Sequence, residues 1–217
     1  FHATCMRILR RHIDRLGYDS NFTIYDTDDQ KSVIKQVCKR LNIDTKMYKE
    51  RTLLSEISSA KDELVDVREF EVKSVGDYKK SVIAKVYREY QETLKKSNAL
   101  DFDDLLLETL ALFEAGELPE EITQRFTYLL VDEFQDIDAL QYRLVRAWTK
   151  GCKSLFAIGD PDQSIYGFRG ADAACFDRLA EDIPGLRVVR LTQNYRSTPE
   201  VLGCALPVIG HNPGGAR

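Results

Sequence analysis

The spacing of apolar residues divides the chain into two kinds of sequence. From about residue 23 to residue 103, apolar positions recur at the period of a helix, which predicts an all-helical block. One such series is Val33, Ile34, Val37, Cys38 and Leu41, and a second runs from Val82 to Leu94. From about residue 124 onward, short apolar runs alternate with helical patterns instead.

This second region predicts a parallel sheet with flanking helices. Buried strands are expected at Phe126 to Val131, Leu155 to Ile158 and Arg187 to Leu191. Helices are expected at about 140–148 and 171–180, and a last one after Thr198-Pro199, because a cap residue followed by proline is typical of a helix start. Strands that alternate with helices are typical of βαβ units, so the predicted fold class is α/β.

Composition is that of an ordinary globular protein. Of the 217 residues, 43% are hydrophobic and 30% are charged, and the longest apolar runs are far shorter than the ~20 residues that a membrane span requires. The five cysteines are scattered and form no C-x-x-C pair, which indicates neither a disulfide framework nor a zinc site. We therefore expect no membrane partner and a reducing, cytoplasmic location.

The net charge is −4, whereas a nucleic-acid binder typically has an excess of basic residues. A local basic groove stays open as an interpretation, since phosphate contacts depend on where lysine and arginine lie. In the helical block, a series of lysines falls on faces that we expect to be exposed: Lys35, Lys39, Lys46, Lys49, Lys61, Lys79, Lys80, Lys95 and Lys96. A solvated helix surface is the favoured interpretation, and a DNA-contacting face is the alternative.

Two adjacent carboxylates follow the first predicted strand. Residues 129–136 read L-L-V-D-E-F-Q-D, so Asp132 and Glu133 stand at the carboxyl end of a strand, where parallel sheets bind ligands. Asp132 can hold Mg²⁺ on the phosphates of a nucleotide, and Glu133 is then placed to polarise the attacking water. The pattern is loose, and a strand end with solvated acids is the alternative.

A glycine-punctuated loop follows the second predicted strand. Residues 157–171 read A-I-G-D-P-D-Q-S-I-Y-G-F-R-G-A. The amide of Gln163 can hydrogen-bond a γ-phosphate without carrying charge, and Tyr166 and Phe168 can stack on bases at ~1–3 kcal/mol each. The alternative is an ordinary turn whose aromatic residues pack on the core.

A third segment, L-T-Q-N-Y-R-S-T-P at residues 191–199, leads from a predicted strand into a helix. Tyr195 could stack on adenine. Arg196 could offset charge on the transferring phosphoryl group, a role worth ~10³–10⁵ in rate where an arginine supplies it. A structural Tyr-Arg pair is the alternative.

The three motifs stand in the order and spacing of the UvrD/PcrA/Rep branch of superfamily 1 DNA helicases, which the chain resembles. Two further segments extend the resemblance over essentially the whole chain, F-H-A-T-C-M-R-I-L-R at 1–10 and L-D-F-D-D-L at 100–105. The resemblance implies that residues 1–22 and 104–217 form part of a RecA-like motor domain, called 1A, with the P-loop NTPase fold. It also implies that residues 23–103 form an inserted helical subdomain, called 1B.

The resemblance also implies roles for single residues. Asp132 would bind Mg²⁺, Glu133 would act as catalytic base, and Gln163 would sense the γ-phosphate of ATP. Tyr195 would face the adenine, and Arg196 would contact the γ-phosphate.

For DNA contacts, the same resemblance points to stacking by Tyr166 and Phe168, with His2 and Arg169 as lesser candidates. Phe168 replaces a tryptophan that is common at its position, so its stacking area is smaller.

No Gly-Lys pair of the P-loop pattern G-x-x-x-x-G-K-[S/T] occurs in the sequence. In the family this loop lies upstream of the Phe-His segment, and a second motor domain lies downstream, so we interpret the chain as a fragment. The resemblance implies a parent enzyme that couples ATP hydrolysis to translocation along single-stranded DNA and duplex unwinding, 3′ to 5′, with repair or replication proteins as further partners. Alone, the chain is expected to be inactive as an ATPase.

Two other functions stay open as alternatives. One is a non-catalytic DNA-binding or interaction module that keeps the motor fold, and the other is a helicase–nuclease fusion whose nuclease lies outside this chain.

Asp101 and Asp104 have the spacing of a helix N-terminus, so we favour capping over catalysis for them. Trp148 lies on an apolar helix stripe and is expected in the core.

Overall fold

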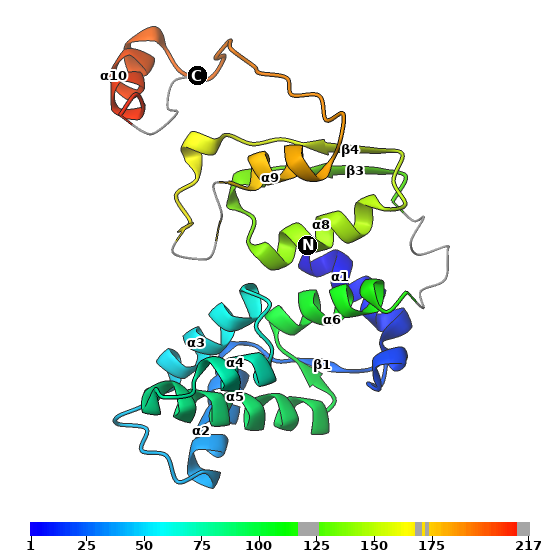
Figure 1. Cartoon of the computed structure of the whole chain (residues 1–217), viewed down its shortest axis with the longest axis vertical. Helices are drawn as coiled ribbons and strands as arrows, with labels where there is room; N and C mark the ends of the chain where they lie inside the picture. The colour runs from blue at the N-terminus through cyan, green and yellow to red at the C-terminus, as the bar shows by residue number, and fades with distance from the viewer. Residues whose placement is uncertain (117–125, 168–170, 172–173, 212–217) are drawn as a thin grey trace. The chain divides into compact units, whose positions relative to one another are not determined.

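A computed structural model describes residues 1–116, 126–167, 171 and 174–211. The chain forms two compact units, Phe1–Leu130 with Asp138–Phe156, and Val131–Ile137 with Ala157–Arg217 (Figure 1). The first unit contains α1 (His2–His12), the 3-10 helix η1 (Ile13–Leu16), β1 (Thr23–Ile24), α2 (Thr27–Arg40), α3 (Glu50–Asp62), α4 (Val67–Lys73), α5 (Tyr78–Lys96), β2 (Ala99–Leu100), α6 (Phe102–Glu114) and α8 (Ala139–Thr149). The strands β3 (Tyr128–Val131) and β4 (Ser154–Ala157) begin in the first unit and end in the second, which holds the 3-10 helices η2 (Phe134–Asp136) and η3 (Pro161–Gln163) and the helices α9 (Cys175–Asp182) and α10 (Pro199–Ile209).

The predicted helical block is confirmed as α2 to α5, which lie together in the lower part of Figure 1. Val33, Ile34, Val37 and Cys38 form the buried stripe of α2, as their spacing predicts. They pack with apolar residues of α3 and α5 in one core, in which the ring of Tyr90 is fully buried. The stabilisation of these helices comes mainly from this shared core, since short isolated helices are marginal in water.

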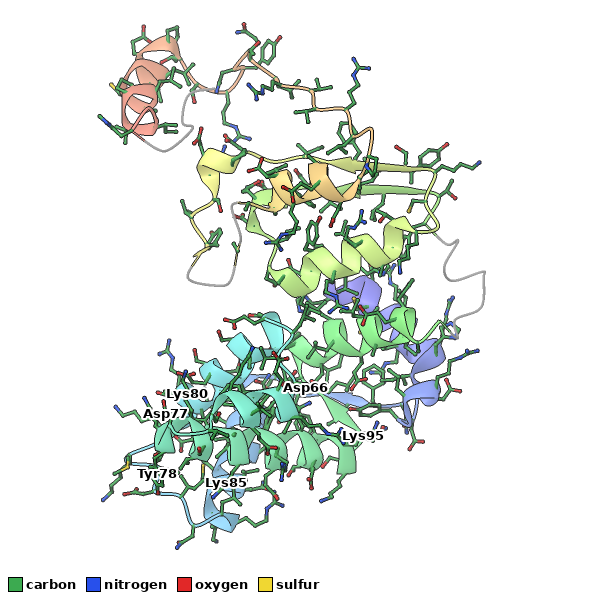
Figure 2. All side chains as sticks on the ribbon, viewed as in Figure 1. Asp66, Asp77, Tyr78, Lys80, Lys85 and Lys95 are labelled. Carbon is green, nitrogen blue, oxygen red and sulfur yellow. The ribbon has the colours of Figure 1, made fainter. Side chains whose placement is uncertain are left out.

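Aspartates begin most of these helices. Asp26, Asp66 and Asp77 are the N-cap residues of α2, α4 and α5, and each accepts a hydrogen bond from a backbone N–H of the first turn (Figure 2). At α6, Asp101 accepts from the Asp104 N–H at 2.8 Å while Asp104 accepts from the Asp101 N–H at 3.2 Å. The predicted capping role of this pair is therefore confirmed, and each such cap stabilises a helix by about 1 kcal/mol.

Two short strands interrupt the all-helical character predicted for the block. Thr23 pairs with Ala99 and Ile24 with Leu100 in a parallel register. The prediction missed them because a two-residue strand has no visible period, and it forms only where a distant segment supplies its hydrogen bonds. The pairing brings the entry and the exit of the block side by side.

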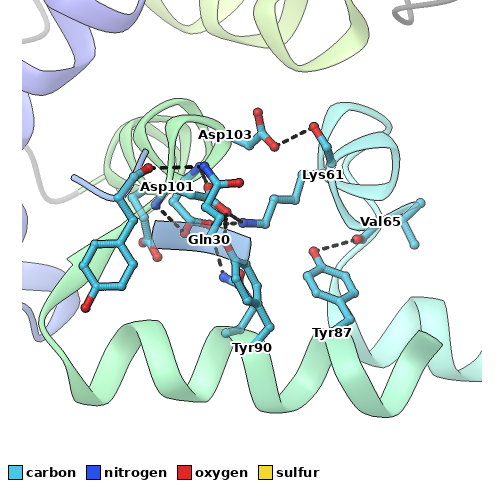
Figure 3. Close-up of polar contacts among 12 residues, drawn as sticks. Gln30, Lys61, Val65, Tyr87, Tyr90, Asp101 and Asp103 are labelled. Atoms are coloured by element: carbon cyan, nitrogen blue, oxygen red, sulfur yellow. Dashed lines mark hydrogen bonds and ion pairs between the residues drawn. The ribbon is translucent and has the colours of Figure 1, made fainter. Parts of the chain in front are cut away.

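Lys61 corrects the expectation that the lysines of the block are all exposed. Its side chain is fully buried, and Nζ lies 2.6 Å from Asp101 Oδ2 and 2.8 Å from Asp104 Oδ1 (Figure 3). Burial alone would lower the pKa of Lys61, but the two carboxylates outweigh it and raise that pKa. The Tyr90 hydroxyl donates to Asp101 at 2.9 Å and the Gln91 amide to Asp104 at 3.1 Å. The buried charges are therefore paired and hydrogen-bonded, as buried charges must be.

The other lysines of the series are exposed. Lys80 and Lys85 project from α5 in Figure 2. Lys95 has a structural contact, because its Nζ donates to the Leu16 carbonyl at 2.6 Å and lies 3.2 Å from the ring centre of Tyr18. This contact joins the end of α5 to the segment that follows α1.

The helices α1, α6 and α8 pack against one another in the first unit. Trp148 is 4% exposed there, with its ring centre 5.7 Å from that of Phe1 and 5.3 Å from that of Phe126. Its predicted place in the core is confirmed. None of the described helices combines the length and the apolar character that a bilayer crossing requires.

Two of the three predicted strands form, and they pair as β3 and β4. The Lys153 N–H donates to Thr127 O, and farther along the Ile158 N–H donates to Val131 O, so both strands advance in the same direction. The fold is thus mixed α/β with small parallel sheets. Side chains alternate along β3, and one face leaves Tyr128 and Leu130 65% and 70% exposed.

The predicted strand from Arg187 to Leu191 is wrong. Within the described residues, no backbone hydrogen bond joins this segment to a strand, and Val188, Val189 and Leu191 are 65–89% exposed. An apolar run is not sufficient for a strand, because a strand also needs a neighbour that pairs with its backbone. The helices predicted around it do form, as α9 and as α10 with Thr198 at its N-cap.

Candidate functional site

The site is built where β3 and β4 end. The Ile158 N–H donates to Val131 O at 2.8 Å, and the Phe134 N–H donates to Ile158 O at 2.9 Å. These bonds hold the segment after one strand against the segment after the other. Polar side chains that follow two different strands therefore meet at one edge.

Asp132 and Glu133 leave β3 through a strained turn. Both are exposed, and the Glu133 N–H donates to Asp132 Oδ1 at 3.0 Å. The φ of Glu133 is 52°, in the left-handed region. A residue with a Cβ in that region costs of order 1–3 kcal/mol and persists only where its surroundings hold it.

An open depression of about 480 Å³ lies beside this turn in the second unit, lined by Glu133, Gln135, Asp136, Asp162, Gln163, Ile165 and Tyr166. It brings together three residues that sequence reasoning selected, Glu133, Gln163 and Tyr166. Asp136 Oδ1 is buried here and has no hydrogen-bond partner among the described residues. The lining of the depression is thus mostly polar and acidic, with Ile165 and the ring of Tyr166 as its apolar part.

Gln163 is held by the cap of η3. Asp160 is the N-cap residue, and its Oδ1 accepts from the Asp162 N–H at 3.0 Å. Its Oδ2 accepts from Gln163 Nε2 at 2.8 Å. Gln163 remains exposed, and its amide nitrogen has a second N–H besides the one that Asp160 accepts.

Gln135 is a residue that sequence reasoning did not select. It is 1% exposed, and its Nε2 donates to Glu133 Oε2 at 2.7 Å while its Oε1 accepts from the Asp160 N–H at 3.0 Å. The available signal was its place two residues after Glu133, next to the buried Phe134. That signal is weak, because the burial of Gln135 depends on the loop after β4.

Gly159 permits the close approach of the two segments. A Cβ at this position would collide with Gln135 Oε1 and would lie 2.9 Å from Phe176 Cζ. Phe176 in turn lies against Phe134, with ring centres 5.1 Å apart, and Cys175 Sγ donates to the Phe134 carbonyl. Helix α9 therefore packs against Phe134, next to Gln135 in the sequence.

Asp132, Tyr195 and Arg196 are not among the described residues that line the depression. Tyr195 is 92% exposed and Arg196 is exposed, on a turn in which Asn194 Oδ1 accepts from the N–H groups of Arg196 and Ser197 at 2.9 and 2.8 Å. Phe168 and Arg169 lie outside the described residues.

His2 belongs to the first unit, where its ring centre lies 6.0 Å from that of Phe102 in an edge-on contact. Its side chain is partly buried. Burial lowers the pKa of His2. A neutral imidazole donates and accepts hydrogen bonds but adds no charge.

The comparisons with known proteins identify the family of the chain. The family model for the UvrD/REP helicase N-terminal domain matches residues 1–184. The chain is 46% identical over 213 residues to the ATP-dependent DNA helicase PcrA of Staphylococcus epidermidis and to that of Bacillus subtilis, and 45% identical to that of Staphylococcus aureus. Each alignment covers 98% of this chain and 29% of the relative, so the chain spans less than a third of the length of these proteins. The chain belongs to the UvrD/REP helicase N-terminal domain family.

Proposed function

We propose that the full-length protein containing this chain is an ATP-dependent DNA helicase, which couples ATP hydrolysis to translocation along single-stranded DNA and to duplex unwinding, 3′ to 5′. The observation that carries the proposal is the depression in which Glu133, Gln163 and Tyr166 converge from the ends of two parallel strands. The relatives that are named ATP-dependent DNA helicases support it.

We further propose that β3 and β4 belong to a RecA-like sheet of the P-loop NTPase fold. Their parallel pairing supports this, as does the exposed apolar face of β3 at Tyr128 and Leu130, since parallel sheets are normally covered on both faces. Residues 1–22 and 104–217 then form part of motor domain 1A, and residues 23–103 form subdomain 1B. The pairing of β1 with β2 at the two ends of the block supports this division.

In this proposal the nucleotide is ATP with Mg²⁺. Asp132 supplies an exposed carboxylate at a strand end, and no group of three metal-binding side chains gathers anywhere in the described ranges. This donor set fits Mg²⁺, which in nucleotide sites takes one or two carboxylates and completes its shell with phosphate and water. Bound there, Mg²⁺ would neutralise charge on the β- and γ-phosphates.

The other residues have separate roles toward ATP. Glu133 accepts a proton from the attacking water. Gln163 lines the same depression and senses the γ-phosphate by donating an amide N–H to a phosphate oxygen. Tyr195 faces the adenine and Arg196 contacts the γ-phosphate. The exposure of these last two side chains supports roles in ligand contact rather than in the core.

Single-stranded DNA and its junction with duplex are the proposed partners, together with repair or replication proteins in the cytoplasm. Tyr166 contributes a ring to the depression that also holds Glu133. Phe168, Arg169 and His2 are proposed as additional strand contacts.

Replacing Tyr166 with alanine in the full-length protein is expected to weaken single-stranded DNA binding by about 5- to 150-fold, because a base–aromatic stack contributes ~1–3 kcal/mol. Fluorescence anisotropy of a labelled oligonucleotide at fixed salt measures the effect. Tyr166→Phe keeps the ring and is expected to bind like the wild type. An alanine variant with unchanged affinity would remove Tyr166 from the DNA contacts.

The proposed function is tested with the full-length protein on tailed duplexes. We expect ATP turnover that rises severalfold or more with single-stranded DNA, and strand separation of a 3′-tailed duplex but not of a 5′-tailed one. DNA binding without any ATP turnover would instead identify the non-catalytic module. Unwinding of the 5′-tailed substrate alone would overturn the polarity and leave the helicase assignment intact.

A further inference from the structure

The side chain of Gln135 has one neighbour that needs a hydrogen-bond donor and one that needs an acceptor. The Glu133 carboxylate can only accept hydrogen bonds and the Asp160 backbone N–H can only donate one, so the bridging side chain needs a donor and an acceptor on the same head group. The two contacts, at 2.7 and 3.0 Å, fix which end of the amide faces which neighbour. A carboxylate, a hydrocarbon or an ammonium at this position would leave one partner unsatisfied.

The contacts continue from Gln135 into the loop after β4. Asp160 receives the bond from Gln135 through its backbone, and its own carboxylate accepts from Gln163 Nε2 at 2.8 Å. Glu133 and Gln163, which follow different strands, are thus joined by one continuous series of hydrogen bonds. Gln135 is the member of that series that crosses from one segment to the other.

Burial and close neighbours surround the bridging side chain of Gln135. Gln135 is 1% exposed, and its backbone carbonyl accepts from Ser164 Oγ at 3.2 Å. A side chain on Gly159 would overlap its amide oxygen. Glu133 itself has a strained backbone with φ of 52°, and such a conformation needs fixed neighbours to persist.

We propose that Gln135 is a positioning residue, which holds the Glu133 carboxylate in place and couples it to the segment that carries Gln163. The inference rests on the proposed function, in which Glu133 is the base and Gln163 faces the γ-phosphate. Because Gln135 is only 1% exposed, we assign it a role that acts through Glu133. Its effect is on the orientation of the base, so turnover depends on it more than nucleotide affinity does.

The test uses two variants of the full-length protein that separate packing from hydrogen bonding. Gln135→Met keeps the side-chain volume and removes both hydrogen bonds. Gln135→Glu keeps the acceptor for the Asp160 N–H but places a second carboxylate against Glu133. Gln141→Met, on α8 in the other unit, is the matched control for a Gln-to-Met change, and Glu133→Gln is the reference for loss of the base.

We expect both Gln135 variants to lower kcat of the DNA-stimulated ATPase by about 10- to 100-fold, the order of loss that a misplaced catalytic group produces. KM for ATP and the affinity for a fluorescent ATP analogue should change by less than about threefold. Gln141→Met should match the wild type in all three measurements. This split between kcat and KM distinguishes positioning from a general loss of the fold.

Two results would overturn the inference and spare the proposed function. One is a Gln135→Met variant with kcat near the wild-type value while Glu133→Gln is inactive. The other is a Gln135→Met variant that loses nucleotide affinity and thermal stability together with turnover, which would assign Gln135 to folding. If Glu133→Gln itself hydrolyses ATP normally, the proposed base is wrong and the role of Gln135 falls with it.

Discussion

Glu133→Gln is expected to lower the DNA-stimulated ATP turnover of the full-length protein by about 10²- to 10⁴-fold, the range that a positioned general base contributes. Glutamine has the shape of glutamate, and its amide oxygen can still accept the hydrogen bond that Gln135 Nε2 donates at 2.7 Å in the native site. It cannot accept a proton from water. We therefore expect kcat to fall while KM for ATP stays within about threefold.

The matched control for this change is Glu181→Gln, a substitution of the same kind at an exposed position of α9 in the same compact unit. It should hydrolyse ATP at the wild-type rate. Steady-state ATPase assays with saturating single-stranded DNA give both parameters for both variants. Equal turnover in Glu133→Gln and in the wild type would exclude Glu133 as the base.

Lys61→Met should have the largest effect on stability in the helical block. The substitution leaves Asp101 and Asp104 buried without their cation, and breaking a buried ion pair in this way costs about 3–5 kcal/mol. Amide hydrogen exchange in the full-length protein should therefore quicken by about 10²- to 10⁴-fold in α3, α5 and the first turns of α6.

The loss should be smaller at pH 5 than at pH 8. Burial and the neighbouring Asp101 carboxylate raise the pKa of Asp104 even with Lys61 present. A carboxyl group whose pKa is raised by folding favours the folded state when it is protonated, so its contribution is lost as the pH rises through the folded-state pKa. Exchange measured at both pH values, corrected for the intrinsic rates, tests the direction.

Two further variants make the stability prediction specific. Lys39→Met removes an exposed lysine from α2 and should change local stability by no more than about 0.5 kcal/mol. Adding Asp101→Asn and Asp104→Asn to Lys61→Met removes the uncompensated charges and should recover a large part of the loss. If Lys61→Met alone exchanges like the wild type, the buried charges do not stabilise this block.

The helices and two of the strands could be predicted because their signals are local. Apolar periodicity and aspartate caps lie within one element and need no knowledge of the rest of the chain. Lys61 was placed wrongly because lysine was counted as polar. Its position four residues after the buried Ile57 put it on the apolar stripe of α3, where only a distant carboxylate pair makes a lysine stable. The two carboxylates, on Asp101 and Asp104, are separated from Lys61 in the sequence by α4 and α5.

In the candidate site, too, features that follow from a local or general rule could be predicted, and contacts that form only on folding could not. The convergence of Glu133 and Gln163 follows from a general rule, since the carboxyl ends of neighbouring parallel strands meet at one edge. Gln135 could not be selected by that rule, because its role arises from contacts that exist only after the strands pair. The apolar run at Arg187 to Leu191 shows the opposite error, a local strand signal without a partner for its backbone.

The pairing of β1 with β2 has a consequence for where the chain can accept insertions. Residues 23–24 and 99–100 lie in register beside each other. The two ends of the segment between them are therefore close together in space. Closely spaced ends are the condition under which one domain can be inserted into another without disturbing its host. In the proposed division the helical block is an inserted subdomain, whose length can diverge while the path of the chain through α1 and α6 stays the same.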